Sequence, residues 1–217
     1  MPPDSTTGQA DTACAWFRSD AGLALLESER PTVLRALSER PVMPWLWLAP
    51  VGQEGVAQGR GLRLVASGAG WSGDACCRLP LPLATESIGV VVLQHVAAPG
   101  RSRRELFEEC ARVLAPGGRL WVFALNPLAP YRWQWRGTGL GASEPLSWRR
   151  RLRAAGLVPE PVSQGLGPGW RVRVAHEPQD GPGMRAAYAI RAEKRAWPIT
   201  PVRQRARLPM PEGIPAA

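Results

Sequence analysis

The sequence lacks any apolar run near the roughly 20 residues that a membrane-spanning helix needs. Residues 1–15 have no basic start followed by an apolar stretch, so we expect no secretory signal and a cytoplasmic location. The four cysteines form no spaced pairs of metal ligands, which predicts reduced thiols and no metal site. The chain also lacks paired carboxylates, a serine nucleophile elbow and a phosphate-binding loop, which argues against the usual hydrolases and phosphotransferases.

Lysine is nearly absent, since Lys194 is the only one, yet abundant arginine gives a net charge of +9. The excess is concentrated in residues 127–153 and 191–217. A basic surface attracts nucleic acid, anionic lipid or acidic metabolites through its long-range potential. Nucleic-acid binding therefore stays open as a less favoured alternative, and nothing in the sequence fixes the oligomeric state.

Glycine and proline, 23 of each, predict many short turns around a single α/β domain. The chain is predicted to consist of a disordered lead (1–12), one domain (13–196) and a basic tail (197–217). Within the domain we expect a helical cover (13–43), a sheet (44–127) and a lid with a final strand pair (128–196).

Short apolar runs bounded by turn residues predict the strands. They are 44–49, 62–67, 88–93, 119–125, 158–164 and 185–195. Residues 68–73 are expected to form a glycine-rich turn, and two short helices separated at Pro31 are expected within 12–40. Further helices are predicted from Ser102 to just before Pro116 and over 146–155. The strand–helix–strand unit over 88–125 is typical of a parallel sheet.

Several segments carry a family resemblance through their order and spacing. They are Gly73–Ala75, Leu79–Pro82, Ser87–Val91, His95–Val96, Arg112–Leu120 and Asn126–Pro127. This run of about 55 residues resembles the class I S-adenosylmethionine (SAM)-dependent methyltransferases of the type-11, ubiquinone-biosynthesis-like kind. Residues 186–203 are similar to the ending of a small bacterial subgroup of such proteins. The resemblance implies a Rossmann-like, seven-stranded, mostly parallel sheet with helices on both faces and an antiparallel last strand.

The resemblance also implies S-adenosyl-L-methionine as the cofactor, held by three elements. A glycine-rich turn follows the first strand, an acid ends the second strand, and an Asp after the third strand contacts the adenine. The matching positions here are Gly52, Ser67 and Asp74 with Ala75. The first two depart from the pattern, because Pro50 removes a backbone donor and the Ser67 hydroxyl is a weaker acceptor than a carboxylate.

Gln94 and His95 follow the strongest predicted strand, where open α/β sheets bind ligands. Gln94 is therefore assigned to the cofactor, and His95 is a candidate general base near neutral pH or else a packing residue. Asn126, Tyr131 and Trp133 are assigned to the substrate, since this region often covers the substrate in the family. The alternative is that this aromatic and basic loop packs on the core.

These observations predict a SAM-dependent methyltransferase that acts on an unidentified small molecule. A methyltransferase-like protein that has lost catalysis and binds a partner is the main alternative, because the glycine-rich loop is degenerate. RNA binding or RNA methylation, suggested by the excess of arginine, is a further alternative.

Overall fold

The computed structural model describes residues 15–52, 58–67, 70–96 and 100–195. Its helices are α2 (Asp20–Leu37), α3 (Gly100–Val113) and α4 (Pro145–Ala154), with a 3-10 helix η1 (Pro130–Trp135). Its strands are β1 (Trp45–Ala49), β2 (Gly61–Ser67), β3 (Gly70–Gly73), β4 (Ile88–Gln94), β5 (Leu114–Leu125), β6 (Leu157–Pro159), β7 (Gln164–Leu166), β8 (Gln179–Asp180) and β9 (Ala187–Lys194). The predicted lead at 1–12 and tail at 197–217 lie outside the described residues.

All these strands form one sheet in the order β3-β2-β1-β4-β5-β9-β7-β8, with β6 also paired to β9. The central pairs β2–β1, β1–β4 and β4–β5 are parallel, and β9 runs antiparallel to β5. The prediction of a mostly parallel sheet with an antiparallel last strand is confirmed. The sheet has nine strands in the described part of the chain instead of the predicted seven, because three short strands lie between α4 and β9.

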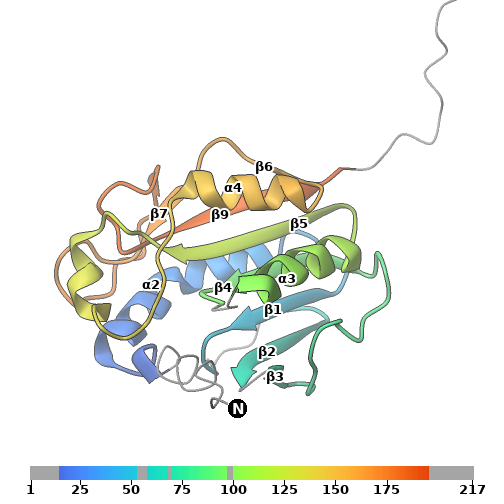
Figure 1. Cartoon of the computed structure of the whole chain (residues 1–217), viewed down its shortest axis with the longest axis horizontal. Helices are drawn as coiled ribbons and strands as arrows, with labels where there is room; N and C mark the ends of the chain where they lie inside the picture. The colour runs from blue at the N-terminus through green and yellow to red at the C-terminus, as the bar shows by residue number, and fades with distance from the viewer. Residues whose placement is uncertain (1–14, 53–57, 68–69, 97–99, 196–217) are drawn as a thin grey trace, which may run out of the picture.

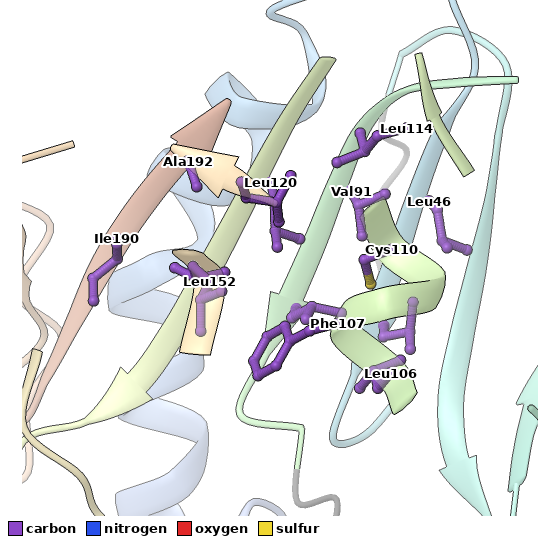
Figure 2. Close-up of a cluster of buried hydrophobic side chains, with 14 of the residues drawn as sticks. Leu46, Val91, Leu106, Phe107, Cys110, Leu114, Leu120, Leu152, Ile190 and Ala192 are labelled. Carbon is purple, nitrogen blue, oxygen red and sulfur yellow. The ribbon is translucent and has the colours of Figure 1, made fainter. Parts of the chain in front are cut away.

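The sheet lies between two layers of helix, with α2 on one face and α3 and α4 on the other (Figure 1). Strand side chains alternate between the faces. In β1, Leu46 and Leu48 belong to the core cluster under α3, whereas Trp45 and Trp47 pack with residues of α2. Figure 2 shows the α3 side, where Cys110 and its helical neighbours face the strands. Apolar residues on both faces of the central strands therefore build two buried layers.

Helix α2 is continuous, so the prediction of two helices separated at Pro31 is wrong. Proline in a helix removes one backbone hydrogen bond. Pro31 is exposed to solvent, so water can satisfy the carbonyl that loses its partner. Val33, Ala36 and Leu37 are buried in the cluster on this side of the sheet and hold the second half of the helix in place.

Strands β2 and β3 pair antiparallel as a hairpin, where only a glycine-rich turn over 68–73 was expected. Ser67 pairs with Gly70 and Leu64 pairs with Gly73, so β3 runs antiparallel to β2. Only residues 68–69 separate the two strands, whereas a parallel crossover needs about a dozen residues. This hairpin decides the position of Asp74.

Candidate functional site at the carboxyl ends of the central strands

The carboxyl ends of β1, β2, β4 and β5 lie along one edge of the sheet, since these strands are parallel. Open α/β sheets bind their ligands at this edge. The last residues of the two middle strands of the sheet are Gln94 in β4 and Leu125 in β5. His95, which follows β4, therefore lies at the edge where the sequence analysis expected it.

Gln94 and His95 both contact one buried carboxylate from α2. Glu29 Oε2 accepts a hydrogen bond of 2.8 Å from Gln94 Nε2. The His95 Nε2 atom lies 2.8 Å and 3.0 Å from the two carboxylate oxygens of Glu29. The Glu29 side chain has no exposed surface, and that of His95 has 2%. A buried carboxyl group of this kind is stable only when it is hydrogen-bonded, as it is here.

The backbone at His95 explains how two consecutive residues reach the same partner. Successive side chains of a strand point to opposite faces of the sheet. His95 leaves the strand with a φ of 48°, a left-handed conformation that is uncommon for residues other than glycine. Its backbone N–H still donates to the carbonyl of Phe123 in β5. The turn at His95 thus brings its imidazole to the same carboxylate as Gln94.

Trp47 fixes the orientation of this network. Its indole Nε1 can only donate, and it donates to Gln94 Oε1 at 3.2 Å. The amide nitrogen of Gln94 must then face Glu29, which accepts from it. Because Glu29 is an acceptor, we assign the proton of the neutral His95 ring to Nε2. Its Nδ1 then carries a lone pair, and this buried atom has no hydrogen-bond partner among the described residues.

His95 lines a cavity of about 50 Å³ at the end of β4. Phe17, which precedes α2, stacks on the imidazole with ring centroids 4.9 Å apart and covers one face of it. The rest of the wall is largely apolar and includes Phe107 of α3 and Trp148 of α4. A cavity of this size holds a few water-sized groups, so it can receive the reacting end of a ligand.

Positive charge borders this cavity on the α3 side. Arg103, which lines it, lies 5.6 Å from the centre of the Trp148 ring, and Arg151 lies 5.2 Å from the same ring. The pKa of Arg103 is lowered by burial and by the charge of Arg151. The Arg103 guanidinium at this wall favours a ligand that carries negative charge.

Asp74 and Ala75 do not lie at this edge, so their predicted position is wrong. Asp74 follows the antiparallel β3 and is therefore carried back along β2, where its Oδ2 accepts from the backbone N–H of Arg63 at 2.7 Å. Arg63 precedes Ser67 by four residues, which places Asp74 about 13 Å from the carboxyl end of β2. Ala75 packs against the core cluster.

Gly52 and Ser67 do lie at the ends of their strands. Gly52 is exposed, and a Cβ added to it would meet no atom within 4 Å. Ser67 is the exposed last residue of β2. At the end of β2 the exposed residue is Ser67 and not an acid, and Gln94 is held by Trp47 and Glu29. Of the positions assigned to SAM, Gly52 and Ser67 are therefore exposed at this edge, whereas Gln94 is part of a buried network.

Two of the three residues assigned to the substrate hold the fold together. Asn126 Nδ2 donates to the carbonyls of Gly183 and Arg185, both at 2.9 Å. Tyr131 is buried and its hydroxyl donates to the Ala21 carbonyl at 3.0 Å, while burial raises its pKa to about 12. Trp133 is 71% exposed and remains available for binding.

The sequence analysis missed Glu29, although the sequence contains a signal for it. Leu25, Glu29 and Val33 are spaced four residues apart and lie on one face of α2. Leu25 and Val33 are fully buried, so a carboxylate between them occupies a core position. An acid on the apolar face of a helix requires a buried partner, and Gln94 and His95 are that partner.

Comparison with known proteins supports the resemblance. A family model described as "Methyltransferase domain" matches residues 68–122, about a quarter of the chain. No curated protein sequence matches the chain. The match includes β4, α3 and most of β5, which together form the parallel strand–helix–strand unit that contains His95.

Solved structures match most of the chain. A SAM-dependent methyltransferase of Thermotoga maritima, described as a possible histamine N-methyltransferase, has a TM-score of 0.53 and 15% identity over 83% of this chain and 93% of its own. The 1,6-didemethyltoxoflavin-N1-methyltransferase of Burkholderia thailandensis, with S-adenosylhomocysteine bound, has a TM-score of 0.51 and 13% identity over 90% of this chain and 93% of its own. A putative methyltransferase of Haloferax volcanii, in complex with the activator Trm112, has a TM-score of 0.51 and 15% identity over 85% of this chain and 98% of its own.

At these identities the structures establish the fold, and the family model adds the methyltransferase match over residues 68–122. S-adenosyl-L-methionine is the cofactor that the family match implies. The chain therefore has the class I methyltransferase fold, as its sequence resemblance predicts.

Proposed function

We propose that the protein is a SAM-dependent methyltransferase that acts on a small-molecule acceptor, with His95 as the base. One observation carries the proposal. The imidazole of His95 is held through Nε2 by the buried carboxylate of Glu29, and its unpaired Nδ1 belongs to a ring that lines a cavity at the carboxyl end of β4. In the class I methyltransferase fold this edge of the sheet is where ligands bind.

The chemistry of this pair suits an acceptor with an O–H or N–H group. S-adenosyl-L-methionine, when bound, supplies an already activated methyl group, so positioning provides much of the rate. An acceptor oxygen or nitrogen that gains a methyl group must lose its proton. His95 accepts that proton at Nδ1, and Glu29 stabilises the imidazolium that results. Phe17 keeps bulk water away from the ring.

The cavity also limits the acceptor. Its volume of about 50 Å³ admits the reacting group and a few neighbouring atoms. The wall at Arg103 favours an acceptor that carries negative charge near its reacting end. We therefore favour a small anionic molecule with a hydroxyl or amine.

A second function, binding without methyl transfer, is favoured by the position of Asp74. The β2–β3 hairpin removes this carboxylate from the ligand-binding edge, and Pro50 and Ser67 replace the other two expected cofactor elements. A protein that has lost these contacts would keep the fold and bind SAM weakly or not at all.

Calorimetric titration with SAM separates the two functions, and His95→Asn tests the role of the base. Asparagine tolerates the left-handed backbone at this position. For a methyltransferase we expect saturable binding of SAM to both proteins. We also expect transfer of labelled methyl from SAM to a deproteinised small-molecule extract by the wild type alone. Absence of SAM binding by the wild type would support the binding function and refute the enzyme. Equal transfer by His95→Asn would refute the role of His95.

A further inference from the structure

Two segments at the η1 end of the molecule expose large apolar side chains. Leu128 is 69% exposed, and Trp133 and Trp170 are each 71% exposed. They line one hollow of about 550 Å³, so residues far apart in the sequence form a single surface. Figure 1 shows the yellow η1 segment and the orange loop before β9 together at the left end of the view. Exposed apolar patches of this kind mark interaction surfaces.

Arginine is interleaved with these apolar groups. Arg132 and Arg136 line the same hollow, and the Arg136 guanidinium lies 4.9 Å from the centre of the Trp133 ring. After Trp170 the chain continues as Arg171-Val172-Arg173-Val174, all exposed. We call the surface made by the residues that line the hollow the Trp–Arg face: Leu128, Arg132, Trp133, Arg136 and Trp170. Neither 127–136 nor 169–175 contains an acidic residue, so this charge is not neutralised within the two segments.

The chemistry of the Trp–Arg face distinguishes between anionic partners. A nucleic acid would stack on the indoles and pair with the arginines, but a bilayer also takes up aliphatic side chains. Leu128 in the hollow is 69% exposed, and Val172 and Val174, which follow Trp170 in the chain, are 43% and 44% exposed. Indole rings concentrate at the headgroup level of bilayers, and arginine is attracted to anionic headgroups. The combination therefore fits a lipid surface better than RNA.

We propose that the Trp–Arg face docks the protein reversibly on anionic lipid bilayers. The docking is peripheral, because no helix in the described residues is long and apolar enough to cross a membrane. The face also adjoins the candidate site. A second hollow of about 330 Å³ shares Arg132 and Arg136 with the first and reaches Leu140, which also lines the cavity beside His95. The docking proposal stands on the surface itself and does not depend on methyl transfer.

Vesicle co-sedimentation of the full chain tests the proposal. The probes are vesicles of phosphatidylcholine alone and of phosphatidylcholine mixed with phosphatidylglycerol. We expect binding to the mixed vesicles that is absent with phosphatidylcholine. The double variant Trp133→Ala/Trp170→Ala should weaken this binding by about tenfold or more, because it removes the two indoles that would enter the bilayer. The matched control Val42→Ala changes a side chain that is 96% exposed elsewhere, and it should bind like the wild type.

Paired charge variants separate the Trp–Arg face from the general positive charge. Arg132→Gln/Arg136→Gln and the control Arg60→Gln/Arg153→Gln each remove two exposed positive charges. Only the first should weaken vesicle binding by about tenfold. Equal weakening by both would overturn the proposal, as would the absence of vesicle binding by the wild type. Binding of single-stranded RNA that the tryptophan variant abolishes, without vesicle binding, would assign the face to nucleic acid instead.

Discussion

Replacement of Glu29 perturbs the centre of the candidate site in a way that stability measurements can resolve. Glu29→Ala removes the buried carboxylate that lies within hydrogen-bond distance of Gln94 Nε2 and His95 Nε2. Losing one buried hydrogen bond to a charged group costs about 1–3 kcal/mol, so the loss of both should cost about 2–6 kcal/mol. That is a large share of the stability of an ordinary domain, about 5–15 kcal/mol.

Glu29→Gln tests whether the lost hydrogen bonds or the lost side-chain volume cause the destabilisation in Glu29→Ala. The amide has nearly the same volume and keeps one acceptor oxygen for Gln94. Its NH₂ group can donate to His95 only if the ring proton moves from Nε2 to Nδ1. We expect a loss of about 1 kcal/mol, since one charge-assisted bond becomes neutral.

Urea unfolding of the two variants provides the measurement, with Glu27→Ala as the control on the same helix. The Glu27 side chain is 47% exposed and pairs only with Arg30 among the described residues, so its loss should change the free energy of unfolding by less than about 0.5 kcal/mol. The reasoning is refuted if Glu29→Ala is no more destabilising than Glu27→Ala. It is also refuted if Glu29→Gln costs as much as Glu29→Ala.

Three further predictions follow from the structure. Asp74→Ala should leave the calorimetric affinity for SAM unchanged within about twofold, because Asp74 lies remote from the ligand-binding edge. A large loss of affinity would show that this residue reaches the cofactor. Tyr131→Phe should lower the free energy of unfolding by about 1–2 kcal/mol in thermal melts, since the carbonyl of Ala21 loses its buried partner. A thiol reagent should modify the exposed Cys76 in the native protein but should not react with Cys110 until the protein unfolds. Burial raises the pKa of the Cys110 thiol and prevents access of the reagent to it. Rapid reaction of Cys110 in the native protein would contradict this prediction.

Much of the sheet could be predicted because the pattern of its strands is unambiguous. The predicted strands at 44–49, 62–67 and 88–93 agree with β1, β2 and β4 to within one residue at each end. Runs that are apolar on both faces have few alternatives to a buried parallel strand. The family resemblance then supplied the antiparallel last strand, β9, which local pattern alone does not orient.

The errors at Pro31 and Asp74 have different physical origins. Tertiary packing overrode a local helix breaker at Pro31, since buried residues on both sides of it keep α2 on the sheet. At Asp74 the resemblance implied a contact with the cofactor, but Asp74 follows β3, which pairs antiparallel to β2 and leads away from the ligand-binding edge. Residues 68–73 were interpreted as a turn, so β3 and its direction were not predicted.

The candidate site was predictable in part. His95 was located correctly by its place after β4, but its partner Glu29 precedes it by 66 residues, and no local pattern joins them. Asn126 and Tyr131 were assigned to a ligand because of their side-chain chemistry, whereas the fold uses that chemistry internally. Polar groups at a ligand-binding edge are ambiguous until their partners are known.

The protonation of His95 is the most direct test of the central claim, which is that its Nδ1 is a free base beside the cavity. The chain has two histidines, and the exposed His176 provides an internal reference in nitrogen NMR of the imidazole rings. For the neutral His95 ring we predict the tautomer with its proton on Nε2, and a shift of that proton to Nδ1 in Glu29→Gln. A His95 ring protonated at Nδ1 in the wild type would contradict the account, because no lone pair would then be available to an acceptor.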